Sequence, residues 1–365
     1  MNRIDLVRPD APPLAGYGPY PVGVKTRDWA DSGRIDVIAS GDGPLRRGNR
    51  PLRAEVWYPA KADTVPVTAY VTDLRDGATQ AVLQGRACRD AVAAPGDYPL
   101  VVISHGYPGN RFLMSHLGET LASRGFVVVA VDHADSTYAD KGPIESTLVN
   151  RPLDVRCVID RVAAEGLANT ARVGVIGYSM GGYGALILGG AGLSEAAMTG
   201  ARADLMAQHR AGVVQVDPRI ACILPIGPWG GARGLWDADG LAGLCVPCLM
   251  IAGSADDISG YAAMRDLFAG SVGAARWLLT FQLAGHNAGA PIPAPAESWL
   301  PVDTLDFVPF EHYADPVWDT VRMNNVTQHF AAAFLGLHLR GDAGMAEHLT
   351  PGEPGPGLTL EAMHP

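Results

Sequence analysis

The sequence predicts an α/β protein with a mainly parallel central sheet and helices on both of its faces. Leu100–Ser104 and Phe126–Val131 are continuous apolar runs, which are typical of strands covered on both sides. Pro152–Glu165 lies between two such runs and carries its apolar residues at helical spacing. Because strands and helices alternate in this way, the strands are expected to pair in parallel.

The N-terminal part predicts a different arrangement. Tyr20–Asp31 and Arg53–Tyr58 are expected to form an antiparallel hairpin, and the Gly- and Arg-rich stretch Gly41–Arg50 is expected to be its loop. Thr64–Asp97 reads as an insertion on one edge of the sheet. Within it, Gly77–Val92 could form a helix.

From residue 100 onward the pattern is regular. Further strands are expected at Arg172–Gly177, Ile220–Ile226, Val246–Ala252 and Trp277–Leu283. Further helices are expected at Phe112–Arg124, after Ser179 to about Gly190, at Tyr261–Phe268 and at Asp315–Leu339. The last of these has most of its large apolar residues on one face.

The chain is expected to form one domain over residues 21–340. Residues 1–20 are rich in Pro and Gly and are expected to form an arm over the surface. Residues 341–365 are expected to form an extended surface tail. The Ala-rich region within residues 191–215 predicts a small helical lid.

Composition narrows the class of partner and the compartment. The formal net charge of -10 argues against nucleic acid or an anionic membrane as the main partner. No apolar run approaches the length of a membrane span. The first ten residues contain no apolar signal-peptide core, and the five cysteines are an odd number at low density, so a cytoplasmic location is expected. Both a monomer and a homodimer fit the sequence.

Two cysteines have the C-x-x-C spacing of redox and zinc sites. Cys245 and Cys248 lie at the start of an expected buried strand, and no second pair completes a zinc site. Core packing is therefore the preferred interpretation, and neither a metal nor a cofactor is expected.

The strongest motif is Gly177-Tyr-Ser-Met-Gly181, a G-x-S-x-G sequence between an expected strand and an expected helix. A serine on such a sharp strand-to-helix turn is a candidate nucleophile. The glycines permit close approach of the backbone, and the N-terminus of the helix carries the partial positive charge that suits a developing oxyanion.

A serine nucleophile needs a base, and the base needs an orienting carboxylate. After Ser179, the order Ser, Asp, His is completed by Asp256, which follows an expected strand, and by His286, which follows the last one. Asp257 is the alternative acid, although it could instead cap the following helix.

Two backbone N–H groups are candidate donors to an oxyanion. One belongs to Met180, directly after Ser179, and the other to Tyr107, in the loop that follows the first core strand. Pro108 has no N–H group and is excluded as a donor.

The ordered set of motifs resembles the α/β-hydrolase superfamily over nearly all of residues 50–340. The motifs are Val56-Trp-Tyr-Pro59, Ser104-His-Gly106, Leu121–Phe126, Arg151–Val155, the Gly177–Gly182 elbow, Gly253–Asp256 and Ala284-Gly-His286. The best match is to dienelactone-hydrolase-like esterases, the branch that includes proteins similar to platelet-activating-factor acetylhydrolase and to polyester hydrolases.

The resemblance implies the α/β-hydrolase fold and serine carboxylic-ester hydrolysis of small to medium esters without a cofactor. Two departures matter. Ser179 stands where true dienelactone hydrolases carry cysteine, and the segment at Trp229 lacks the acid of the acetylhydrolase pattern, which returns the choice to Asp256. Tyr107, Met180 and Trp229 are similar to the aromatic, Met and Trp lining of cutinase-like polyester hydrolases, although ordinary apolar lining would also explain them.

Several functions remain open at this point. An acyltransferase or perhydrolase could use the same residues, as could a polyester hydrolase. A non-catalytic binding module that kept the fold is a further alternative, which the complete set of Ser179, His286 and Asp256 disfavours.

Overall fold

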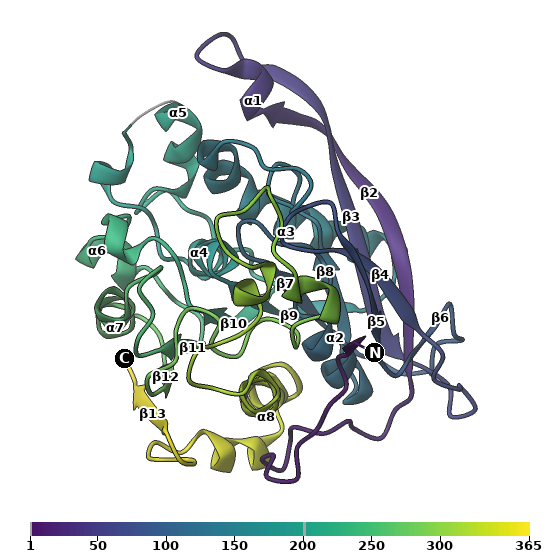
Figure 1. The fold of residues 1–365 in the computed structure, drawn as a ribbon. Coiled ribbons are helices and arrows are strands. Elements are labelled where there is room, and N and C mark those ends of the chain that lie inside the picture. Colours follow the sequence, from purple (N-terminus) through teal and green to yellow (C-terminus); the bar gives the residue numbers. More distant parts are fainter. Residues whose placement is uncertain (1, 200–201) are drawn as a thin grey trace.

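A ten-stranded sheet forms the centre of the molecule, with helices on both faces (Figure 1). A computed structural model describes residues 2–199 and 202–365. The strand order is β13-β12-β11-β10-β9-β7-β8-β3-β2-β6, and a small separate sheet of order β1-β5-β4 packs against it, with Trp57 donating to the Tyr70 hydroxyl at 3.0 Å. The six strands from β12 to β8 are parallel, whereas β3, β2 and β13 join by antiparallel pairing.

The strands are β1 Asn2–Arg3, β2 Val22–Asp36, β3 Arg46–Pro59, β4 Ala69–Asp73, β5 Gln80–Gln84, β6 Ala87–Arg89, β7 Pro99–Ser104, β8 Val127–Val131, β9 Asn169–Tyr178, β10 Ile220–Ile226, β11 Cys248–Gly253, β12 Arg276–Phe281 and β13 Leu358–Met363. The α-helices are α1 Val37–Ser40, α2 Ser115–Ser123, α3 Ile144–Glu165, α4 Met180–Leu188, α5 Ala203–Met206, α6 Ala238–Ala242, α7 Tyr261–Gly270 and α8 Thr320–Arg340.

The central strands are buried on both faces. In β7, Val101 belongs to one hydrophobic core, while its neighbours Leu100 and Val102 belong to the other. This alternation is what a strand requires, because successive side chains point to opposite faces. Helices α2 and α8 cover the first core, and α3, α4 and α7 cover the second. The expected buried parallel strands and the helices between them are therefore present.

The N-terminal hairpin is longer than expected. Strands β2 and β3 pair from Val22↔Pro59 to Asp36↔Arg46, so much of the expected Gly41–Arg50 loop is strand. The hairpin projects from the body of the molecule in Figure 1.

The helix considered for the ambiguous stretch Gly77–Val92 does not form. Residues in this range form β5 and β6 instead. In β5, Ala81 and Leu83 are buried whereas Val82 between them is exposed. That period of two buries one face of a strand, and it would spread the same residues around a helix.

The C-terminal segment differs from the expected extended surface tail. A 3₁₀ helix covers Ala343–Leu349, and β13 then joins the edge of the main sheet beside β12. The reason is that Leu358 and Leu360 are apolar at a spacing of two and are buried by this pairing. Pro351, Pro354 and Pro356 come just before these leucines, and in the sequence alone such prolines favour an extended tail over a strand.

The expected arm at residues 1–20 begins at Met1, and the expected lid at residues 191–215 spans residues 200 and 201; these three residues lie outside the described part. Within the arm, Ile4 and Ala15 are buried, and the Leu14 N–H donates to His329 on α8. Within the lid region the described residues form short helical turns, including α5.

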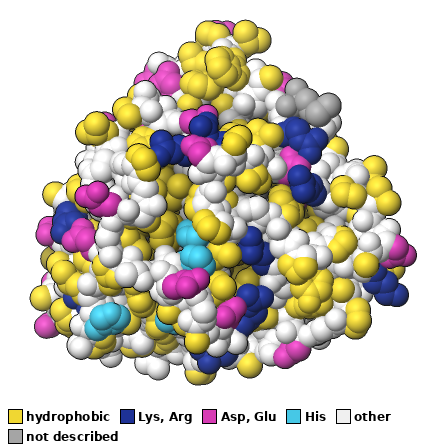
Figure 2. All heavy atoms as spheres, turned by 90° about the horizontal axis from the view of Figure 1, so that it is seen from below, with side chains coloured by type: hydrophobic (Ala, Val, Ile, Leu, Met, Phe, Trp, Pro, Cys, Tyr) yellow, Lys and Arg dark blue, Asp and Glu magenta, His cyan; other side chains and the backbone are white. Residues whose placement is uncertain are grey.

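Surface charge is mixed on the face drawn in Figure 2, where acidic and basic side chains are interspersed among hydrophobic and uncharged ones. Among the described residues, no helix combines the length and apolar character needed to cross a membrane.

Candidate active site

Ser179 lies at the sharp corner between β9 and α4. Its backbone has φ 53° and ψ -110°, a conformation that side-chain-bearing residues rarely adopt. A Cβ at Gly177 would lie 2.1 Å from the Gly181 carbonyl oxygen, and one at Gly181 would lie 2.0 Å from the Ser104 carbonyl oxygen. Only glycine fits these two positions, which is the physical reason for the motif.

A chain of hydrogen bonds joins Ser179, His286 and Asp256. The Ser179 Oγ lies 2.9 Å from His286 Nε2, and His286 Nδ1 lies 2.9 Å from Asp256 Oδ2. The three residues follow β9, β12 and β11 at the carboxyl ends of the strands. The structure thus brings together the three residues selected from the sequence.

The ambiguity between the two aspartates has a geometric answer. The second carboxylate oxygen of Asp256 accepts hydrogen bonds from the N–H groups of Ile258 and Ser259, both at 2.9 Å. Asp256 is buried and fixed by these contacts, whereas Asp257 is exposed and, within the described part of the chain, forms no hydrogen bond with His286. Asp256 is therefore the aspartate bonded to the imidazole, and its service as the catalytic acid stays a prediction.

Two neighbours that the sequence analysis did not select hold the His286 loop. The Tyr178 ring packs against the His286 ring, with centroids 5.2 Å apart, and its hydroxyl donates to Asn287 Oδ1 at 3.0 Å. The Asn287 amide donates in turn to the carbonyls of Glu311 and Ala314 at 2.9 and 2.6 Å. The loop is thus tied both to the elbow strand and to the segment before α8.

The two expected backbone donors border the same space as Ser179. Met180 is the first residue of α4, where an N–H has no acceptor within the helix. Tyr107 lies across the cavity, in the loop after β7, and its hydroxyl donates to the Gly142 carbonyl at 2.5 Å. Their service as oxyanion donors stays a prediction.

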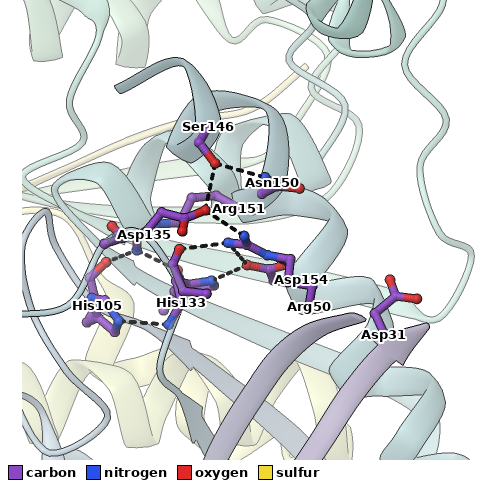
Figure 3. Close-up of polar contacts among 12 residues, drawn as sticks. Asp31, Arg50, His105, His133, Asp135, Ser146, Asn150, Arg151 and Asp154 are labelled. Atoms are coloured by element: carbon purple, nitrogen blue, oxygen red, sulfur yellow. Dashed lines mark hydrogen bonds and ion pairs between the residues drawn. The ribbon is translucent and has the colours of Figure 1, made fainter. Parts of the chain in front are cut away.

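Buried Arg151, on α3, lies directly behind the loop after β7 (Figure 3). Its guanidinium donates to the carbonyls of His105 and Gly106 and to the Ser136 hydroxyl. The His133 N–H donates to His105 Nε2 at 3.1 Å, so His105 Nδ1 carries the hydrogen that it donates to the Gly106 carbonyl at 2.7 Å. These contacts fix the backbone that carries Tyr107.

A buried carboxylate belongs to the same cluster. Asp154, one turn along α3, accepts from His133 Nδ1 at 3.0 Å and from Arg50 at 2.7 and 3.0 Å (Figure 3). Despite complete burial, the Arg50 guanidinium and His133 hold the pKa of Asp154 well below its usual range. Burial lowers the pKa of His133 to about 4, so this histidine is neutral at pH 7.

The Ser179 hydroxyl opens on a cavity of about 540 Å³. Tyr107, Met180 and Trp229 all line it, although their part in substrate binding stays a prediction. Trp229 is held at the elbow, because its N–H donates to the Ser179 carbonyl at 3.1 Å.

The cavity is also lined by residues that the sequence analysis did not select: Arg75, Asn287, Phe307, Glu311 and His312. No local motif marks them, because they come from the β4–β5 hairpin and from the irregular segment before α8. Burial, with help from the positive charge of Arg75, lowers the pKa of His312 to about 3, and the ring accepts or donates one hydrogen bond with the Tyr138 hydroxyl at 2.8 Å.

The two cysteines of the C-x-x-C pair lie in different surroundings. Cys245 is exposed and Cys248 is buried in β11, and both are free thiols. Burial raises the pKa of Cys248 to about 12, which leaves almost no reactive thiolate at pH 7. Among the described residues, no group of three His, Cys, Asp or Glu side chains is placed to hold a metal ion.

Residues 84–273 match a family model described as PETase, PET hydrolase-like. The chain belongs to this family. The match includes the elbow and Asp256 but ends before His286. Membership confirms the resemblance to the α/β-hydrolase superfamily and narrows the branch to the PET hydrolase-like proteins.

Curated relatives match shorter stretches. Cutinase est1 of Thermobifida alba is 27% identical over 175 residues, which are 48% of this chain and 48% of the relative. Cutinase est2 of the same organism is 36% identical over 91 residues, 25% of this chain and 30% of the relative. Bis(hydroxyethyl) terephthalate hydrolase of Streptomyces coelicolor is 28% identical over 147 residues, 40% of this chain and 45% of the relative. The chain therefore spans about half or less of the length of these relatives.

A solved structure is similar over the whole chain. A ferulic acid esterase from Streptomyces cinnamoneus superposes with a TM-score of 0.69 and 22% identity, covering 98% of this chain and 99% of that one. This likeness confirms the predicted fold class, the α/β-hydrolase fold.

Proposed function

We propose that the protein is a serine carboxylic-ester hydrolase that acts on small to medium esters. The observation that carries the proposal is the hydrogen-bonded series Ser179, His286 and Asp256 at the floor of an open cavity. Membership of the PET hydrolase-like family supports it, as do relatives named cutinase and a structural neighbour named ferulic acid esterase.

The geometry suits acylation of the serine. His286 Nε2 takes the proton of Ser179 as Oγ attacks the ester carbonyl, and Asp256 holds Nδ1 protonated and stabilises the imidazolium that forms. The carbonyl oxygen becomes an oxyanion, for which the N–H groups of Met180 and Tyr107 are the proposed donors. His286 then gives its proton to the leaving alcohol, and an acyl-enzyme remains.

Deacylation repeats the steps with water as the nucleophile. His286 removes a proton from water, the hydroxide attacks the acyl carbonyl, and the proton returns to Ser179 Oγ as the carboxylic acid leaves. One ester and one water thus give one acid and one alcohol, and no cofactor enters the balance.

Hydrolysis of short p-nitrophenyl esters tests this proposal. The wild type should release p-nitrophenol far faster than Ser179→Ala, and the residual rate of the variant should approach that of buffer. Equal rates for the two proteins would refute ester hydrolysis at Ser179.

A polyester hydrolase is the second candidate. It is favoured by the cutinase and bis(hydroxyethyl) terephthalate hydrolase relatives and by the Tyr107, Met180 and Trp229 lining. Release of soluble acids from a polyester film by wild type, but not by Ser179→Ala, would support it. An acyltransferase or perhydrolase would instead show partition of the acyl group to an added alcohol or to peroxide.

A further inference from the structure

Arg75 contributes a guanidinium to the wall of the active-site cavity. It lies in the turn between β4 and β5, a hairpin outside the main sheet. The Asn110 amide fastens this hairpin to the loop after β7 by donating to Thr72 Oγ1 at 2.8 Å and to the Asp73 carbonyl at 3.0 Å. A Cβ at Gly77 would lie 2.3 Å from the Tyr138 carbonyl oxygen, so the turn also packs directly against the segment between β8 and α3. The backbone that carries Arg75 is therefore fixed by a packed turn.

The guanidinium of Arg75 has no anionic partner within the described part of the chain. Its Nη1 is buried without a hydrogen-bond acceptor, and its Cζ lies 5.4 Å from the centre of the Phe307 ring, which also lines the cavity. Two other interior arginines near the site have polar partners: Arg50 pairs with Asp135 and Asp154, and Arg151 donates to two carbonyls while its Nε lacks an acceptor. A partly buried cation without a partner is costly, which makes a ligand anion the fitting counterpart.

The other ionisable groups around the cavity leave Arg75 available. Among the described lining residues it is the only lysine or arginine. Asp257 and Glu311 also border the cavity, but both are exposed, and no ion pair with Arg75 is formed by either. His312 beside it is neutral at pH 7, and His286 is engaged with Ser179 and Asp256.

We propose that Arg75 binds a carboxylate carried by the substrate, so that the site takes esters with a second, free carboxyl group, such as half-esters of dicarboxylic acids. A planar guanidinium fits a carboxylate through two parallel N–H bonds, and Phe307 supports it from its face. This inference rests on the proposed ester hydrolysis at Ser179. It adds a charge preference that the neutral lining by Tyr107, Met180 and Trp229 does not supply.

Monomethyl and dimethyl terephthalate form a matched pair of probes, since they differ only in one free carboxylate. The readout is the ratio of kcat/KM for the half-ester to that for the diester, followed by methanol release. In Arg75→Gln this ratio should fall about 10- to 100-fold, as expected for lost hydrogen bonds to a charged group. In Arg75→Lys the ratio should fall less, because lysine keeps the positive charge but cannot form the two parallel N–H bonds of a guanidinium.

Arg46→Gln is the control for a general loss of positive charge, because Arg46 is exposed on the projecting β2–β3 hairpin (Figure 1). It should leave the ratio as in the wild type. A fall of both rate constants by the same factor in Arg75→Gln would overturn the proposal and make Arg75 a structural residue. So would a wild type that cleaves the diester and ignores the half-ester.

A binding measurement separates this proposal from ester hydrolysis itself. Calorimetry with Ser179→Ala should detect monomethyl terephthalate, and the double variant with Arg75→Gln should bind it about tenfold or more weakly. If the wild type cleaves neither ester but this difference in binding appears, the anion site stands and hydrolysis fails. Equal binding by the two variants would refute the anion site whatever the activity.

Discussion

Replacing Arg151 by methionine should uncouple the loop after β7 from its support. The side chain is buried and donates to the carbonyls of His105 and Gly106 and to the Ser136 hydroxyl. Gly106 keeps its bond from His105 Nδ1, whereas the His105 carbonyl and Ser136 lose this donor. At about 1–3 kcal/mol for each buried polar group left without a partner, the loss is about 2–6 kcal/mol.

One gain offsets part of this loss. Burial lowers the pKa of Arg151 to about 9, because the charged guanidinium loses its hydration in the folded protein. Methionine carries no charge and avoids this desolvation cost. We therefore expect the free energy of unfolding to fall by about 2–4 kcal/mol, measured by urea denaturation. In conditions where the variant is folded, kcat for a p-nitrophenyl ester should fall by up to about 100-fold, because the Tyr107 N–H is no longer held in place.

Arg156→Met is the matched control on the same helix. Arg156 is half-buried and donates to the Gln215 carbonyl, away from the loop. Its kcat should stay close to that of the wild type, and Arg151→Lys should recover part of the activity. An Arg151→Met protein that is destabilised but keeps the wild-type kcat would refute the role assigned to this support.

Three other changes test the choice of aspartate, the packing of the elbow and the burial of a histidine. Asp256→Asn should lower kcat by on the order of 10⁴-fold in a steady-state assay, whereas Asp257→Asn should change kcat by no more than about threefold. Similar losses of kcat in the two variants would contradict the choice of Asp256. Gly181→Ala places a Cβ 2.0 Å from the Ser104 carbonyl oxygen, so its melting temperature should drop by more than about 5 °C, and an unchanged value would contradict the packing. Burial lowers the pKa of His116 to about 3, so stability that is present above pH 6.5 should be lost as pH falls toward 3, by about 1.4 kcal/mol per pH unit for this histidine. His116→Met should flatten the dependence of unfolding free energy on pH, and an unaltered slope would count against this explanation.

The residues around the elbow could be predicted from the sequence because their positions follow from strand ends. Ser179, Asp256 and His286 each come shortly after a buried apolar run, and parallel strands bring their carboxyl ends to one edge of the sheet. The glycines of the elbow carry a local steric signal that needs no knowledge of the rest of the chain.

Other residues could not be predicted, because their surroundings form only in three dimensions. Arg75 and His312 are 237 positions apart and reach the cavity from irregular or peripheral segments. Arg151 stood in a recognisable motif, yet its bonds to the loop after β7 depend on how α3 packs. The helix considered for Gly77–Val92 does not form, because the strands there are short and their two-residue alternation is hard to tell from a helical pattern in the sequence alone. The cytoplasmic location and the oligomeric state stay predictions.

The central claim is that Ser179 is the nucleophile, activated by His286. Its most direct test is intact-mass analysis after incubation with a fluorophosphonate probe, followed by peptide mapping. We expect one phosphonyl adduct, located on Ser179, in the wild type, a much slower adduct in His286→Ala, and none in Ser179→Ala. A folded wild type that takes up no probe, or an adduct at another residue that persists in Ser179→Ala, would contradict it.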